Sequence, residues 1–126
     1  MGPGVLGPAM SRLDLTDDQR SRVRQITESH REEQRAIADR ARQAHAALRE
    51  VTEGGTFDEA AVRARAADVA NVEADMAVAR ARIFSEVYQI LTPEQQAKLK
   101  TLQAERGQRQ ERVRERVQER RERRQR

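Results

Sequence analysis

The motif Leu15-Thr16-Asp17-Asp18-Gln19 recurs near the other end of the chain as Leu91-Thr92-Pro93-Glu94-Gln95, and the two copies mark where helices begin. In both copies the threonine is a favourable N-cap, and the glutamine three residues later completes a capping box. Acidic residues in the first turn, and proline at the first helical position of the second copy, are also typical of helix starts. Two helices are therefore predicted to begin alike, with the capping residues Thr16, Gln19, Thr92 and Gln95.

Apolar residues follow the first copy at three- and four-residue steps, which predicts one amphipathic helix to about residue 53. Gly54-Gly55 ends it, and a second helix is expected to start at Thr56 or Asp58 and to end around Leu91. A short glycine turn between two long helices predicts an antiparallel hairpin. The residues expected in the core or in dimer packing are Val23, Ile26, Ile37, Leu48, Val62, Val69, Met76, Ile83 and Val87.

The composition favours a thin molecule rather than a thick globular core. Charged residues make up 37% of the 126 residues and aromatic residues only 2%, so little aromatic area is available for burial. Abundant Ala, Arg, Glu and Gln favour long helices. We predict an all-α fold, a long antiparallel helical hairpin plus a third helix from Thr92. The apolar stripe that such a hairpin leaves uncovered predicts a dimer.

Three segments differ in composition. Residues 1–12 are rich in Gly and Pro and are predicted to be a flexible leader; they lack the charged and apolar regions of a signal peptide. Residues 13–106 form the predicted helical domain. Residues 107–126 are almost entirely Arg, Glu and Gln, and we expect them to be helical or disordered without burying a core. Interleaved Glu and missing aromatics argue against specific nucleic-acid binding, and no stretch is apolar enough for membrane insertion.

Catalytic residue patterns are not found in the sequence. The chain has no Cys, only two His, no Gly-rich phosphate loop and no nucleophile motif. We therefore predict that the protein is not an enzyme and requires no cofactor.

A line of arginines is the candidate client-binding surface. At 100° per residue on one helix these side chains lie within about 20° of a common direction. A basic surface bordered by apolar residues would attract clients by charge and then hold exposed apolar segments. The alternative is an ordinary solvated face, neutralised by nearby carboxylates. The arginines of this line are Arg24, Arg31, Arg35, Arg42 and Arg49.

His30 lies at the centre of the first apolar stripe. With Glu33 it forms a pair that could supply two ligands to zinc or another divalent transition metal. The alternative is a packed histidine bonded to a nearby Gln or Glu. The hairpin register places Glu73 about 10 Å from His30 along the helices, which argues against a shared site within one chain.

The paired Leu-Thr-x-x-Gln motifs, together with Phe57-Asp58-Glu59-Ala60 and the segment from Val78 to Gln95, resemble the Spy/CpxP family of small periplasmic proteins. The resemblance covers about residues 13–105. It implies a thin, curved dimeric cradle in the periplasm that binds unfolded or partly folded proteins without ATP, or that modulates an envelope sensor protein. A related branch, resembling ZraP and CnrX, binds transition metals.

The sequence analysis therefore predicts an ATP-independent periplasmic chaperone of this type, working as a homodimer on non-native clients. Two alternatives stay open. One is a metal-responsive sensor or metal-binding protein that depends on His30, and the other is a coiled-coil adaptor for one folded partner.

Overall fold

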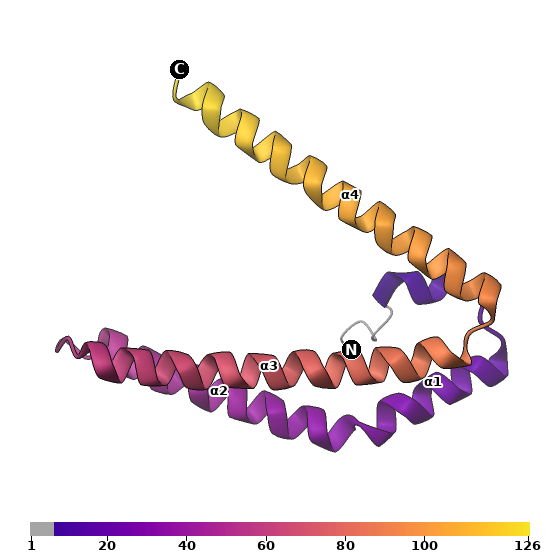
Figure 1. The fold of residues 1–126 in the computed structure, drawn as a ribbon, viewed down its shortest axis with the longest axis horizontal. Helices are drawn as coiled ribbons and strands as arrows, with labels where there is room; N and C mark the ends of the chain where they lie inside the picture. The colour runs from indigo at the N-terminus through magenta and orange to yellow at the C-terminus, as the bar shows by residue number, and fades with distance from the viewer. Residues whose placement is uncertain (1–6) are drawn as a thin grey trace.

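The computed structural model describes residues 7–126 of the chain. Within that range it contains helices and no strand, so the predicted all-α class is confirmed. Figure 1 shows an elongated hairpin with a fourth helix projecting away from one end. The elements in chain order are η1 (Gly7–Arg12), α1 (Asp17–Ser29), α2 (Arg31–Glu53), α3 (Glu59–Ile90) and α4 (Pro93–Arg124).

The predicted hairpin is formed by α2 and α3, which pack along each other. Gly55 has a φ of +83°, in the left-handed region that glycine adopts at little cost, and this lets the chain reverse after α2. Asp58 then caps α3, because its carboxylate accepts a hydrogen bond from the Ala61 amide at 3.2 Å. The turn therefore begins and ends at residues whose local chemistry favours it.

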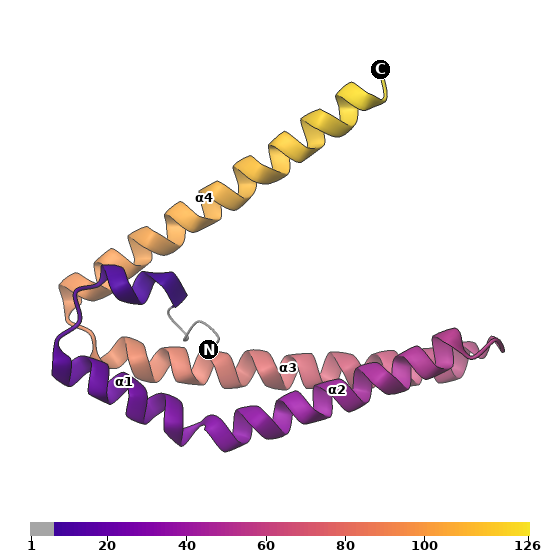
Figure 2. The ribbon, with the colours of Figure 1, turned by 180° about the vertical axis from the view of Figure 1, so that it is seen from behind.

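The single first helix predicted from residue 16 to residue 53 is wrong, because the structure divides it at His30. The His30 amide bonds back to the Thr27 carbonyl at 3.3 Å, a three-residue step that interrupts the helical ladder. Nearby, the Thr27 hydroxyl donates to the Val23 carbonyl and the Ser29 hydroxyl to the Ile26 carbonyl. Such side-chain bonds to the backbone often bend helices. Figures 1 and 2 show the resulting bend, through which α1 and α2 both remain packed on α3.

Two small cores hold the hairpin together. One lies midway along α2 and α3, where Ile37 packs with Val72 and Ala79. The larger core lies at the opposite end from the Gly turn, where α1, α3 and the start of α4 meet. Its buried members are Leu13, Leu15, Val23, Ile83, Val87, Leu91 and Leu99.

Residues 7–12 differ from the flexible leader predicted for residues 1–12. They form η1, in which Ala9 and Met10 pack against the larger core, and that apolar contact accounts for their order. Residues 1–6 of the predicted leader lie outside the described residues. After η1 the chain turns at Asp14, whose φ of +53° is tolerated by aspartate better than by most residues.

The residues expected in core or dimer packing are covered to different extents. Val23, Ile37, Ile83 and Val87 are buried. The other five are only partly covered: Ile26, Leu48, Val62, Val69 and Met76. Burial decreases toward the Gly turn, where Ala-rich helices supply few large side chains.

The chain exposes far more surface than a compact protein of its size. Its accessible surface is 10161 Å², whereas a compact monomer of 14.4 kDa exposes about 6,800 Å². Part of the excess comes from α4, which continues as one helix to Arg124 and whose residues from 103 onward are all exposed. The thin architecture expected from composition is therefore present in the fold.

Candidate functional site

The two Leu-Thr-x-x-Gln motifs meet at the junction of α1, α3 and α4. In each motif the threonine hydroxyl accepts a hydrogen bond from the backbone N–H of the glutamine, at 3.1 Å for Thr16 and 3.2 Å for Thr92. Each glutamine side chain returns a bond, because its carbonyl accepts from the threonine backbone N–H at 3.0 Å. Both helix starts therefore carry complete capping boxes.

The same two glutamines also bind each other, which the sequence analysis did not foresee. Gln19 Nε2 lies 2.6 Å from Gln95 Oε1, and Gln95 Nε2 lies 3.0 Å from Gln19 Oε1. Each side-chain amide also donates to a backbone carbonyl just before the other helix: Gln19 to the Ile90 carbonyl at 3.2 Å, and Gln95 to the Leu13 carbonyl at 3.2 Å. The signal in the sequence was the repetition itself, since both motifs carry the same capping threonine and glutamine.

This amide pair determines how the molecule is laid out. Gln19 is buried to 8% exposure, and its bonds tie the first turn of α1 to the end of α3 and the first turn of α4. These four side-chain bonds and the packing of Leu99 in the larger core together hold the start of α4 on the hairpin. Figure 2 shows α4 diverging from α3 beyond this junction.

His30 is a second polar contact, at the break between α1 and α2. Its Nε2 lies 2.9 Å from Glu86 Oε2 on α3, and its Nδ1 lies 3.6 Å from Glu33 Oε2 on α2. The hydrogen bond to Glu86 raises the pKa of His30 above its ordinary value; the negative charges of both carboxylates act in the same direction, and partial burial opposes them. The ring therefore joins the bend of the first helix pair to α3.

The structure places the two predicted metal ligands together without a third. His30 and Glu33 lie side by side, but Glu33 also contacts the guanidinium of Arg82 at 3.6 Å. Over residues 7–126, no group of three or more His, Asp or Glu side chains is arranged to hold a metal ion. Glu73 is exposed on α3, and the nearby Arg40 of α2 contacts Asp75 at 3.0 Å.

The five predicted client-binding arginines are all exposed, and the break at His30 divides them. Arg24 lies on α1, whereas Arg31, Arg35, Arg42 and Arg49 lie on α2. Two of the five engage neighbouring carboxylates: Arg31 contacts Glu28, and Arg42 contacts Asp39. The line expected on one continuous helix is therefore divided between two helices that meet at a bend.

The family model described as "LTXXQ motif family protein" matches residues 4–103, which include both capping motifs and the hairpin between them. The chain belongs to this family. The resemblance drawn from the two motifs is therefore confirmed.

This LTXXQ family member is also similar to curated proteins and to a solved structure. The chain is 37% identical over 87 residues to the periplasmic protein CpxP of Escherichia coli strain K12, and equally to CpxP of strain O6:H1; the match covers 69% of this chain. It spans 51% of the length of those relatives. Among solved structures, the Salmonella Typhimurium VirG-like (STV) protein superposes with a TM-score of 0.66 at 26% identity, covering 83% of this chain and 98% of its own.

Among the helices of residues 7–126, none combines the length and the apolar character needed to cross a bilayer.

Proposed function

We propose that this protein is an ATP-independent periplasmic chaperone of the Spy/CpxP type, which binds unfolded or partly folded proteins and limits their aggregation. The observation that carries the proposal is membership of the LTXXQ family together with 37% identity to a protein named as periplasmic. The family is not known for enzymes, which accords with a binding role.

The exposed surface supports a binding role of this kind. A chaperone must hold many sequences weakly, which suits a large surface with dispersed charge and small apolar areas more than one deep pocket. The arginines of α1 and α2 would attract acidic or polar segments at long range, since charge acts more on encounter rate than on final affinity. Partly covered apolar residues on the hairpin, such as Met76 and Val69, would then contact exposed apolar segments of the client.

The test is suppression of light scattering by an aggregation-prone client diluted from denaturant, without ATP. Suppression near one dimer per client in the presence of a chelator is the expected result. The double variant Arg35→Glu, Arg42→Glu should capture clients more slowly and with a weaker salt dependence. The control Arg63→Glu, Arg80→Glu makes the same charge change at exposed positions of α3 and should behave as the wild type. Absence of suppression by the wild-type protein would refute the chaperone function.

A homodimer is part of the proposal. The chain exposes about 3,300 Å² more than a compact monomer, and thin helical hairpins commonly reduce such an excess by pairing. Analytical ultracentrifugation should give twice the 14.4 kDa of one chain. A monomeric mass at micromolar concentration would contradict it.

The alternatives are separated in the same assays. Zinc added after the chelator tests the metal-binding reading, in which suppression would appear only with zinc and would be lost in His30→Gln. An adaptor for one folded partner, such as an envelope sensor protein, would bind that partner tightly and leave aggregation unchanged.

A further inference from the structure

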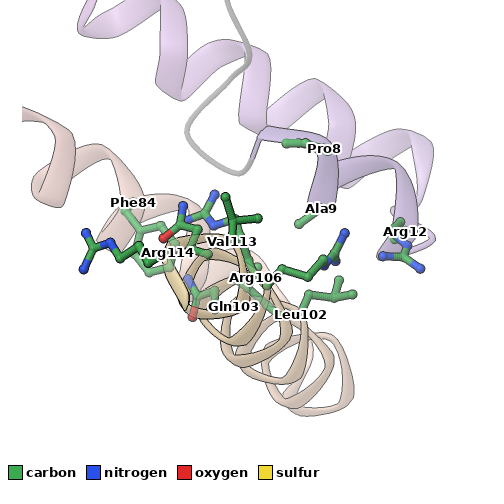
Figure 3. Close-up of a pocket in the computed structure, with 12 residues that line it drawn as sticks. Pro8, Ala9, Arg12, Phe84, Leu102, Gln103, Arg106, Val113 and Arg114 are labelled. Carbon is green, nitrogen blue, oxygen red and sulfur yellow. The ribbon is translucent and has the colours of Figure 1, made fainter. Parts of the chain in front are cut away.

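A groove lies in the angle between η1 and α4, with one side chain of α3 at its base. Its volume is about 620 Å³, and Figure 3 shows its lining residues converging from the three elements. Phe84 of α3 and Leu99, Leu102 and Val113 of α4 supply its apolar surface. Leu99 is buried, but Val113 is 58% exposed, so the apolar surface continues outward along α4. This volume lies within the range of clefts that bind ligands in proteins, about 300–1,000 Å³.

The charge around this groove is of one sign. Arg12 of η1 and Arg106, Arg109 and Arg114 of α4 border it, and no Asp or Glu lines it. Among residues 7–126 none of these four guanidinium groups takes part in an ion pair, although ten ion pairs occur elsewhere in that range. The groove therefore presents four free cations around an apolar floor.

The arrangement of charge along α4 extends this feature beyond the groove. At 100° per residue, Val113, Val117 and Arg120 all lie within about 40° of the direction of Arg106. The glutamates of the same segment all point about 100° or more away from that direction. These glutamates are Glu105, Glu111, Glu115, Glu119 and Glu122. One side of α4 is therefore basic and apolar, and its acidic residues are kept on the other sides.

This separation favours a partner of opposite charge over a second copy of the chain. Residues 105–126 contain ten Arg and five Glu, a net charge of +5, whereas the whole chain carries +4. A two-fold contact uses the same patch on both subunits, so pairing this face with itself would place arginine against arginine. A lipid surface is also disfavoured, because a flat bilayer cannot reach Phe84 and Leu99 at the base of a groove walled by η1.

We propose that the groove between η1 and α4 docks a short, acidic, amphipathic helix of a partner protein. Leucine-like side chains of that helix would lie against Phe84, Leu102 and Val113, and its carboxylates would pair with the bordering arginines. Arginine suits this role, since its planar group binds a carboxylate through two parallel hydrogen bonds. The inference is independent of the chaperone proposal, because it concerns a defined helical ligand rather than non-native chains.

The test uses the full chain and a fluorescent synthetic helix of Glu, Ala and Leu, with Leu at positions i, i+3, i+4 and i+7. Its anisotropy should report saturable binding that weakens with salt. A second peptide with Gln in place of every Glu should bind about tenfold more weakly, which corresponds to ~1.4 kcal/mol. Val113→Asp should weaken the acidic peptide by a similar factor, because it places a carboxylate on the apolar floor.

Matched variants distinguish the groove from general positive charge. Arg106→Glu, Arg109→Glu should lower the affinity about tenfold or more, while Arg112→Glu, Arg123→Glu makes the same charge change on other sides of α4 and should change it less than about twofold. Circular dichroism confirms that each variant remains helical. These exposed substitutions lie outside both cores, so the fold should be retained.

Several results would overturn the inference. Equal binding of the Glu and Gln peptides would show that the arginines do not recognise the carboxylates of the ligand. Equal losses of affinity in the groove and control variants would show that only the overall positive charge of α4 attracts the peptide. A change of sedimentation mass in Arg106→Glu, Arg109→Glu with unaltered peptide binding would assign the groove to a second copy. Binding to phosphatidylglycerol vesicles that depends on the same arginines, without peptide binding, would assign it to a lipid surface. If the wild-type protein binds the peptide but does not suppress aggregation of the client, only the chaperone proposal is refuted.

Discussion

The amide pair between Gln19 and Gln95 gives the sharpest test of how this fold is held together. Replacement of Gln19 by alanine removes four contacts: the bond accepted from the Thr16 amide, the bond donated to the Ile90 carbonyl, and both bonds with Gln95. A hydrogen bond contributes about 0.5–1.5 kcal/mol net, and the Ile90 carbonyl would lose a partner in a half-buried position. We expect Gln19→Ala to lower the free energy of unfolding by about 2–4 kcal/mol.

For a chain of this length, about 1 kcal/mol corresponds to roughly 4 °C, so the melting temperature should fall by about 8–16 °C. Thermal unfolding followed by circular dichroism measures the shift directly. Gln25→Ala is the matched control, because Gln25 lies on the same helix and is exposed. That variant should melt within about 2 °C of the wild type, since alanine is at least as good a helix former.

A double-mutant cycle separates the mutual bond from the two caps. Gln95→Ala should cost a similar amount, and the double variant should cost at least about 1 kcal/mol less than the sum, because the shared bonds can be lost only once. Strictly additive losses would show that each glutamine acts only within its own capping box. Equal melting of Gln19→Ala and Gln25→Ala would refute the junction as a determinant of stability.

Three further predictions follow from the cores, the histidine and the tail. The pKa of His30 is raised in the folded state, so its pairing with Glu86 stabilises the fold at pH values below the unfolded pKa of about 6.5. This stabilisation is lost as the pH rises through the folded pKa. The melting temperature of His30→Gln should therefore lie furthest below that of the wild type near pH 6 and closest to it near pH 9. Ile83→Ala, at 1% exposure, should cost about 2–5 kcal/mol in chemical unfolding, and Val78→Ala, at 56% exposure, less than about 1 kcal/mol. Deletion of residues 107–126 should leave the melting temperature within about 2 °C while reducing the helical signal, since every residue removed is exposed; a large loss would mean that the tail packs on the domain.

Much of the fold could be predicted because its signals are local. The helix starts at Thr16 and Thr92 depend on the chemistry of four consecutive residues, and the reversal at Gly54-Gly55 depends on backbone freedom at one turn. The apolar spacing placed residues such as Ile83 and Val87 on the inner side of the hairpin, where they are buried. The family resemblance came from the same motifs.

The errors and omissions concern side-chain contacts that the apolar spacing does not reveal, some of them local and others between distant segments. The break at His30 escaped prediction because the apolar spacing runs through it without a glycine or proline. Its location depends on Thr27 and Ser29 bonding to the backbone and on Glu86, fifty-six residues away, binding the ring. Order in residues 7–12 likewise depends on an apolar contact with the larger core.

The helix starts, the hairpin turn and the apolar side of each helix could be read from the sequence alone, because they follow from capping, backbone freedom and a 3.6-residue period. Tertiary packing alone brings the two capping glutamines together, directs α4 away from the hairpin, and borders an apolar groove with four arginines that form no ion pair within residues 7–126. Those features need segments more than seventy residues apart to meet, and such distances in space are set by packing rather than by local preference.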